Sequence, residues 1–395
     1  MAEYDDFREI AHCGGRIVFR IERLEDGRRT YSISVHHDRP TPAAIIGIYA
    51  LAPEGIPVGD FRIGGIGQIA DPPPSETAMA VFLGSDSRTC WGHECGECGG
   101  YFRNGQHPAI YPLTCPYCAV RADAYRFLST AQKRYVKHYI EMLFDGLQVE
   151  MAPGAVHEIV IDMDAIVDQH SGEERPAFYY AAEGQQTRYE CDHCGDFNDI
   201  RGRYGYCASC GWRNNVQLLK AGLEALRERL NADAISPEEA LRACISEFDS
   251  CCRDIAAQLG RRVPMKQPRR DALTRALFHN VDAPIFAQLK ETLDIDLLQG
   301  LASDLPFVRK MLQRRHLFEH NGGVVSRRYL DESGDATASE GVLLRETREN
   351  VHRLIGILNR IAANSDRDFH ELFPPTSKPI AMFEPQRKRA QQAKS

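Results

Sequence analysis

The sequence lacks the features of a membrane or secreted protein. No apolar run approaches the roughly 20 residues that span a bilayer. The first residues, MAEYDDFREI, are acidic and lack the apolar core of a signal peptide. With 395 residues, 43% hydrophobic and 26% charged, the chain has the composition of a globular protein of two or three domains. We therefore expect a cytoplasmic protein without a membrane partner.

The sequence also lacks a nucleotide-binding loop and an overall basic charge. The glycines of "GGIG" at 64–67 have no following Lys-Ser/Thr and predict turns. The net charge of −7 gives no global reason to expect nucleic acid. Arginine pairs in the C-terminal half indicate a solvated face that is also compatible with a local phosphate-binding surface. These pairs are Arg261-Arg262, Arg269-Arg270, Arg314-Arg315 and Arg327-Arg328.

Cysteine is abundant, and its spacing indicates metal. Eight of the thirteen cysteines form four C-x-x-C pairs. Two such turns facing each other complete a tetrahedral four-sulfur site, which Zn²⁺ fills with no open position. We predict two structural Zn²⁺ ions, in two zinc ribbons. The ligands are Cys95, Cys98, Cys115 and Cys118 for the first ion, and Cys191, Cys194, Cys207 and Cys210 for the second.

Some ligand assignments stay open at this stage. Cys90, His93 and His193 lie close enough in sequence to substitute for a cysteine. The first set also resembles a rubredoxin iron knuckle, although zinc suits a non-redox context better. Glycines beside the pairs (Gly96, Gly99, Gly211) suit a tight turn. The remaining cysteines, Cys13, Cys244, Cys251 and Cys252, are predicted to fill cores.

Hydrophobic periodicity predicts an α+β multidomain chain: a β-rich N-terminal half that carries both ribbons, then an α-helical bundle. Strands are expected at 15–24, 30–37, 156–167 and 176–183, with a helix at 122–147. Helical patterns fill the chain from 216 onward, and one helix is expected to begin at the cap Ser236 with Pro237 next. The expected domains are 1–88 (β-rich), 89–147 (ribbon 1 and helix), 148–214 (β segment and ribbon 2), 215–234 (helical linker), 235–372 (bundle) and 373–395 (disordered basic tail).

The segment "QRRHLFEHNGG" at 313–323 allows several interpretations. His316 and His320 lie four residues apart, share a helix face and formally match the inverted zincin motif H-x-x-E-H. A zincin needs a further acidic ligand downstream, and nothing singles out one of Glu346, Glu349 and Glu371. Asn-Gly-Gly also ends the helix at His320. The protease interpretation is therefore the weaker one.

The same segment resembles the HEPN superfamily, whose helical proteins include many metal-independent ribonucleases. Arg315-His316-x-x-x-His320 followed by Asn321 is similar to the family motif at the end of a bundle helix, and the resemblance covers 235–372. It implies an endoribonuclease that acts as a homodimer on RNA, in a role such as prokaryotic antiviral or toxin-like defence, with the ribbons recognising RNA or a trigger. His320 would be the base or acid, Arg315 the phosphate clamp, and His316 and Asn321 auxiliaries.

A structural interpretation remains beside it. His320 and Asn321 could only cap the helix, with Arg315 in a salt bridge. The corresponding function is a non-enzymatic zinc-ribbon module that binds nucleic acid or protein and whose bundle dimerises. The sequence alone leaves the ribonuclease and this binding module open.

Overall fold

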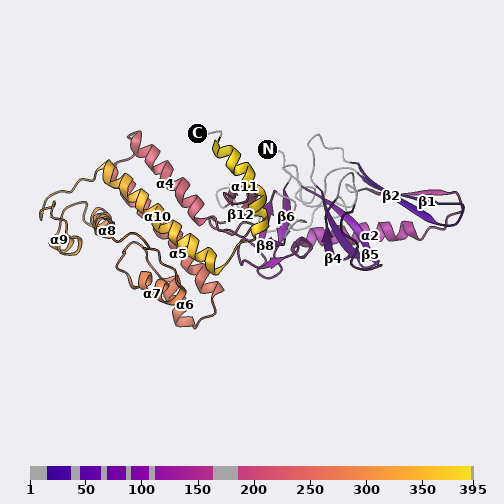
Figure 1. Ribbon diagram of the computed structural model, residues 1–395, viewed down its shortest axis with the longest axis horizontal. Coiled ribbons are helices and arrows are strands. Elements are labelled where there is room, and N and C mark those ends of the chain that lie inside the picture. Colours follow the sequence, from indigo (N-terminus) through magenta and orange to yellow (C-terminus); the bar gives the residue numbers. More distant parts are fainter. Residues whose placement is uncertain are drawn as a thin grey trace. The chain divides into compact units, whose positions relative to one another are not determined.

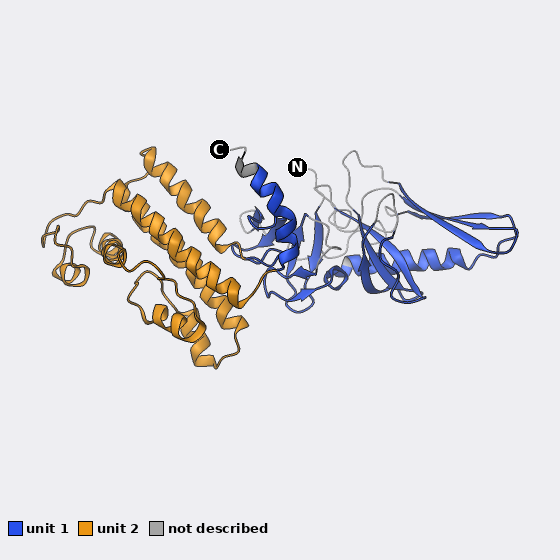
Figure 2. Ribbon diagram, viewed as in Figure 1, with its two compact units in different colours: residues 1–212, 376–395 blue, residues 213–375 orange. Residues whose placement is uncertain are grey.

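The computed structural model describes residues 16–36, 45–63, 69–85, 90–105, 112–162 and 186–392. The chain divides into two compact units: unit 1 comprises 1–212 with 376–395, and unit 2 comprises 213–375 (Figure 2). Sheets lie in the N-terminal half and most described helices in unit 2 (Figure 1), so the predicted α+β class is confirmed. The predicted strand at 176–183, the turn at 64–67 and Cys13 lie outside the described residues. No described helix is long and apolar enough to cross a bilayer.

One sheet of unit 1 is built from chain segments far apart in sequence. It is antiparallel, with the order β10-β1-β2, and alternate residues of β1 such as Ile17 and Ile21 are fully buried. The edge strand β2 is exposed along almost its whole length, and its large apolar side chains Tyr31 and Ile33 are 63% and 40% exposed. The strands are β1 (Arg16–Arg23), β2 (Arg29–His36) and β10 (Val156–Asp162).

A helix packs against this sheet and a second one. The second sheet has the order β4-β3-β5, and Tyr139 and Leu143 of α2 lie in the core that joins both sheets. The predicted helix at 122–147 begins later than expected, because Ser129 forms a capping box with Gln132. The elements are β3 (Ile45–Leu51), β4 (Ile56–Phe61), β5 (Ala78–Gly84), the 3-10 helix η3 (Ala124–Phe127) and α2 (Thr130–Leu147).

The two ribbons share one sheet instead of forming separate modules. Strand β12 of the second ribbon pairs with β7 of the first, in the order β11-β12-β7-β6. Cysteines of both ribbons consequently lie in a single buried cluster. The predicted boundary at 147/148 is thus not a structural one, since β10 returns to the first sheet and β12 to the first ribbon. The strands are β6 (Trp91–Glu94), β7 (Tyr101–Asn104), β8 (Leu113–Thr114), β9 (Arg121–Ala122), β11 (Gln186–Glu190) and β12 (Phe197–Arg201).

The C-terminal tail differs from the expected disorder. Residues Ser377–Gln392 form helix α11, which belongs to unit 1. Ile380 packs against the ribbon core, and the Phe383 ring lies where a Cβ on Gly195 would be. The Thr376 N–H donates to the Cys210 carbonyl at 2.7 Å. The apolar side chains within this basic segment supply the buried contacts that its overall composition does not reveal.

Unit 2 is a helical bundle in which α5 contacts α4, α6, α8 and α10. Helix α4 was expected to be a linker, but buried leucines on one face, among them Leu219 and Leu223, make it part of the bundle. The predicted start at Ser236 is confirmed by a capping box, and Cys244, Cys251 and Cys252 are buried as expected. The helices are α4 (Asn215–Asn231), α5 (Pro237–Arg262), α6 (Gln267–Thr274), α7 (Pro284–Leu293), α8 (Leu305–His320), α9 (Arg327–Ser333) and α10 (Arg348–Leu372).

Candidate functional site

All four C-x-x-C turns adopt the same backbone. In the first turn, the Cys95 N–H donates to the Gly100 carbonyl at 2.9 Å and the Gly99 N–H donates back to the Cys95 carbonyl at 2.8 Å. The residue four positions after each first cysteine has a left-handed backbone, which favours glycine. These residues are Gly99 (φ 65°), Ala119 (φ 62°), Gly195 (φ 72°) and Gly211 (φ 75°). Gly96 is not among the positive-φ residues, so its predicted role in the turn is not required.

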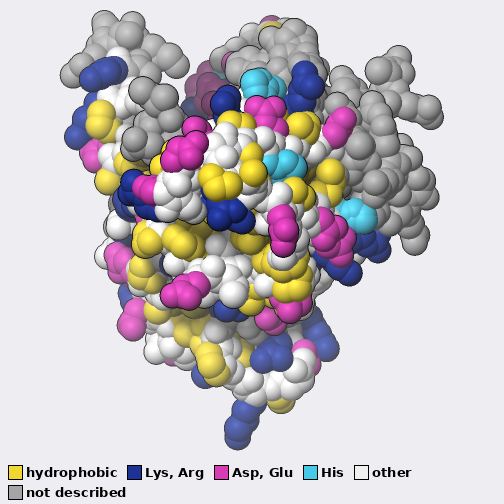
Figure 3. Space-filling view, turned by 90° about the vertical axis from the view of Figure 1, so that its right-hand side faces the viewer, with side chains coloured by type: hydrophobic (Ala, Val, Ile, Leu, Met, Phe, Trp, Pro, Cys, Tyr) yellow, Lys and Arg dark blue, Asp and Glu magenta, His cyan; other side chains and the backbone are white. Residues whose placement is uncertain are grey.

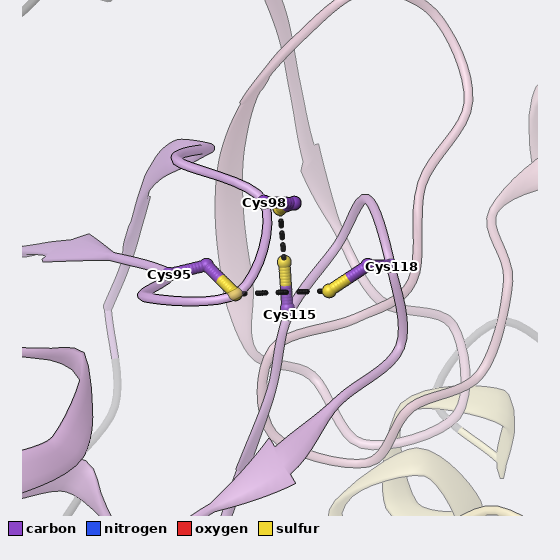
Figure 4. A group of neighbouring side chains, drawn as sticks. All are labelled: Cys95, Cys98, Cys115 and Cys118. Atoms are coloured by element: carbon purple, nitrogen blue, oxygen red, sulfur yellow. Dashed lines mark hydrogen bonds between the residues drawn. The ribbon is translucent and has the colours of Figure 1, made fainter.

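The sulfurs of each predicted set converge on one point. In the first cluster, Cys95 Sγ lies 3.6 Å from Cys118 Sγ, and Cys98 Sγ lies 3.7 Å from Cys115 Sγ (Figure 4). The second cluster has corresponding distances of 3.7 Å (Cys191–Cys210) and 3.5 Å (Cys194–Cys207). Four sulfurs at about 2.3 Å from a tetrahedral Zn²⁺ lie about 3.8 Å apart. Both clusters are therefore positioned to hold a metal ion.

The two clusters differ in exposure. Cys98 and Cys118 of the first cluster are exposed, whereas all four thiols of the second are buried. In the second cluster, hydrogen bonds among the four sulfurs lower the pKa of Cys191 and raise the pKa values of Cys194 and Cys210. The Asn198 amide donates to Cys207 Sγ at 3.4 Å. The second cluster is thus the better shielded of the two.

The alternative ligands lie outside both clusters. His93 Nε2 is 2.8 Å from Asn104 Oδ1, and complete burial lowers the pKa of His93 to about 4, so its imidazole is neutral and structural. The His193 ring stacks on Trp212 with centroids 3.6 Å apart. Cys90 is buried but belongs to neither group of potential ligands found among the described residues. Each cluster therefore has four cysteine ligands.

The adjacent arginines of the 313–323 segment have different environments. Arg314 is buried with a side chain 6% exposed, and its guanidinium contacts Asp335 at 2.7 Å and Glu346 at 3.1 Å. Tyr329 Oη also donates to Asp335, at 2.7 Å. The expectation of a solvated Arg314-Arg315 face is wrong for Arg314, which serves the core of unit 2. Arg315 is 23% exposed and lies 3.6 Å from Glu319.

Arg315 and His316 line one open cleft of unit 2, with a volume of about 550 Å³. The Nε of Arg315 is buried and has no hydrogen-bond partner among the described residues. An adjoining cleft of about 110 Å³ is lined by His316 and Asn321. Two further arginines and a second histidine, Arg309, Arg328 and His279, line the larger cleft.

His316 lies next to two other predicted site residues, Arg315 and His320. Its ring centroid lies 4.5 Å from that of His320, and partial burial followed by the charges of His320 and Arg328 lowers the pKa of His316. The neutral imidazole, a proton acceptor, is therefore favoured near neutral pH. Arg315 and His320 are about 140° apart around α8, since each residue advances by about 100°. Within one chain, Arg315 meets His316 in the cleft, while His320 contacts His316 from the helix end.

The zincin interpretation finds little support in this geometry. The capping interpretation is met in part, because Arg315 pairs with Glu319 at 3.6 Å as it expects. Among the described residues, the two cysteine clusters are the only groups that could hold a metal through three or more ligands. Glu346, a candidate third ligand, is engaged by Arg314. Helix α8 ends at His320 as predicted, and the Asn321 N–H donates to the Leu317 carbonyl. In the described part of the chain, His320 makes no hydrogen bond to the last carbonyls of α8.

Sequence reasoning missed three residues of the cleft. His279 lies in the loop between α6 and α7, far from the motif, and no local pattern points to it. Arg328 belongs to a noted arginine pair, but only the fold brings it to α8. Arg309 is held by both oxygens of Asp282 at 2.6 Å, and Arg328 by Glu332 at 2.8 Å.

Comparisons with protein-family models, curated proteins and solved structures found no match to this chain. The resemblance of 235–372 to the HEPN superfamily therefore stays a prediction. The geometry shows two four-cysteine groups in unit 1 that are positioned to hold metal ions, and a cleft lined by arginine and histidine side chains in unit 2.

Proposed function

We propose that this protein is a metal-independent endoribonuclease of the HEPN type whose active site is the cleft of unit 2. Arg315 and His316 would act there, with His320 and Asn321 supporting His316. We further propose that the clusters hold two structural Zn²⁺ ions, that the ribbons recognise RNA or a trigger, and that the bundle forms a homodimer. Such a protein fits prokaryotic antiviral or toxin-like defence.

One observation carries the proposal: the cleft brings together Arg315 and His316, which the motif selects, with Arg309, Arg328 and His279, which it does not. The Arg315 Nε has no hydrogen-bond partner in the described part of the chain. That Nε faces Glu319 Oε2 at 3.6 Å, beyond hydrogen-bond distance. A guanidinium held only by this loose pair, beside an imidazole, suits a phosphoryl group, whose oxygens accept its N–H donors.

The chemistry follows from these side chains. Metal-free RNA cleavage needs a base for the 2′-hydroxyl proton, an acid for the leaving 5′-oxygen and a cation near the phosphorane. His316, whose pKa is lowered, suits the base, and Arg315 stays charged at any working pH. Because the nucleophile is the 2′-hydroxyl, DNA is not a substrate.

The rival function is a non-enzymatic zinc-ribbon module that binds nucleic acid or protein and whose bundle dimerises. The ion pairs of Arg309 with Asp282 and Arg328 with Glu332 favour it, because they offset much of the positive charge of the cleft. Figure 3 shows a face of unit 1, and on its described part basic, acidic and hydrophobic side chains are interspersed. That face gives no reason to expect broad phosphate binding by unit 1.

The test is a cleavage assay on total RNA in EDTA, kept short so that structural metal is retained. The wild type is compared with Arg315→Ala, His316→Ala and His320→Ala. Arg360→Ala is the control, since Arg360 forms a surface pair with Asp304 and lies outside the cleft. We expect products with 2′,3′-cyclic phosphate and 5′-hydroxyl ends from the wild type and the control, and a loss of about 10²-fold or more for Arg315→Ala and His316→Ala.

Two results would contradict the proposal. Full activity of Arg315→Ala and His316→Ala would remove the cleft from the reaction, and proteolysis that EDTA abolishes would favour the zincin instead. RNA binding without cleavage by any chain supports the binding module. Native mass spectrometry tests the zinc proposal separately: we expect two zinc ions per chain, and iron or an empty chain would contradict it.

A further inference from the structure

A second histidine reaches the cleft from a distant part of the bundle. His279 lies in the loop between α6 and α7 and lines the same cleft as Arg315 and His316 of α8. Its side chain is 35% exposed, so the imidazole is neither a core filler nor a free surface group. The fold therefore places two imidazoles, from separate elements, around one space of about 550 Å³.

A carboxylate lies beside this second imidazole on one side. Asp249 of α5 accepts the Phe278 N–H on Oδ1 at 2.6 Å, and the same oxygen lies 3.5 Å from Nδ1 of His279. The Asp249 side chain is 15% exposed, and Arg253 lies 3.7 Å from its other oxygen. The Phe278 bond fixes the carboxylate, so Asp249 Oδ1 faces the Nδ1 edge of the ring.

The other edge of the imidazole is available. Among the described residues, Nε2 of His279 has no hydrogen-bond partner. Two other histidines of unit 2 differ: His352 Nε2 lies 3.0 Å from Asn231 Oδ1, and His370 Nε2 accepts the Arg213 N–H at 3.2 Å. In those two histidines, Nε2 is used in contacts within the protein. In His279, a ring held at Nδ1 leaves Nε2 for a ligand in the cleft.

Resting on the proposed ribonuclease function, we infer that His279 is the general acid of the reaction and that Asp249 is its positioning residue. His316 takes the proton of the 2′-hydroxyl, the 2′-oxygen forms a bond to phosphorus, and the bond from phosphorus to the 5′-oxygen breaks. His279 donates its Nε2 proton to that 5′-oxygen. The products are a 2′,3′-cyclic phosphate and a 5′-hydroxyl, with no net change of oxidation state.

Two histidines divide the proton transfers because their surroundings differ. Arg315 and Arg328 border His316, and after partial burial and His320 their charges contribute to lowering its pKa. Asp249 borders His279, with its Oδ1 3.5 Å from Nδ1 of the ring. A base flanked by cations and an acid flanked by a carboxylate is the arrangement that this reaction needs at neutral pH.

The experiment uses the full chain and two RNA oligonucleotides of one sequence. In one, the scissile 5′-oxygen is replaced by sulfur, a leaving group that departs without protonation. We expect His279→Gln to lose about 10²–10⁴-fold on the normal RNA and to recover most of that loss on the 5′-thio RNA. His316→Gln, which removes the base, is expected to stay slow on both. His352→Gln is the matched control and should cleave both like the wild type.

Positioning by Asp249 has its own readout. Asp249→Asn keeps an oxygen for the Phe278 N–H but removes the charge that faces Nδ1. In ¹⁵N spectra of histidine-labelled protein, we expect the proton distribution between Nδ1 and Nε2 of His279 to change in this variant, and that of His352 to stay constant. An unchanged His279 signal would contradict the positioning role, whatever the cleavage rate.

Failure of the inference and failure of the proposed function give different results. If the wild type cleaves and His279→Gln cleaves equally well, or is equally slow on both RNAs, the general-acid role is wrong and the nuclease stands. If neither the wild type nor any variant cleaves RNA, the general-acid role of His279 and the proposed ribonuclease function are both wrong. A 2′-O-methyl oligonucleotide then shows by ¹⁵N shifts of His279 and His316 whether the cleft still binds RNA, as the binding module would.

Discussion

The two adjacent arginines of α8 should respond to mutation in opposite ways. Arg314→Ala leaves the carboxylates of Asp335 and Glu346 buried and unpaired, since their side chains are 1% and 0% exposed. Removing one partner of a buried ion pair costs about 3–5 kcal/mol of unfolding free energy. Arg315→Ala removes only a partly exposed pair with Glu319 at 3.6 Å, worth about 0–1 kcal/mol.

For a domain of this size, the loss in Arg314→Ala corresponds to a fall in melting temperature of about 6–20 °C. Calorimetry of the full chain measures it, and hydrogen exchange of peptides from α8 and α10 assigns the shifted transition to unit 2. Arg315→Ala, in contrast, should keep the melting temperature and lose RNA cleavage. Equal melting temperatures for the two variants, or a larger fall for Arg315→Ala, would refute the distinction between a structural and a functional arginine.

Three further predictions concern unit 1. A chelator should remove metal from the first, partly exposed cluster before the second. Thiol alkylation followed by mass spectrometry should then label the cysteines of the first cluster earlier. Simultaneous labelling of both clusters would contradict this order. Gly195→Ala should destabilise unit 1 more than Gly99→Ala in thermal unfolding, because both glycines have positive φ but only at Gly195 would a Cβ meet the Phe383 ring. Burial and then the charge of Asp123 raise the pKa of Asp60 to about 6, so ionisation of Asp60 lowers the free energy of unfolding as pH rises from about 4 to 6. Asp60→Asn should therefore stabilise the protein by up to about 3 kcal/mol at pH 7.5 and by little at pH 4. An equal effect at both pH values would contradict the raised pKa.

Local patterns predicted the local structure well. The C-x-x-C pairs identified both metal-binding groups because each turn is specified by contiguous residues, and the Asn-Gly-Gly after His320 predicted the end of α8. Gly322 and Gly323 both have positive φ, as such a stop requires. Helices with strong caps, such as the one that begins after Ser236, were equally visible.

Pairings between distant segments were not predictable from these patterns. Nothing in β12 indicates that Asp199 forms a buried ion pair at 2.6 Å with Arg103, which joins the two ribbons into one sheet. The same holds for β10, which completes a sheet begun by β1. The tail at 373–395 was expected to be disordered because its average composition is basic, yet Ile380 and Phe383 anchor it. A few apolar contacts outweigh composition when a folded surface is available to receive them.

The burial of Arg314 could have been predicted from the sequence. It lies three residues from both Met311 and Leu317, which are buried, so helical periodicity places it on the inner stripe of α8. Arg315 is about 100° further round the helix and leaves that stripe. Because the two arginines are adjacent, we treated them as one basic pair. Their different positions around the helix distinguish Arg314, which faces the core, from Arg315, which lines the cleft.

This arrangement links the stability of unit 2 to its cleft. Arg314 ties α8 to Asp335, beyond the end of α9, and to Glu346, just before α10. Tyr329, from α9, bonds to the same Asp335. Because α8 carries Arg315 and His316 while α9 carries Arg328, the buried network fixes the two helices whose side chains face each other across the cleft. Loss of Arg314 should therefore lower activity through displacement of α9, even though Arg314 never contacts the ligand.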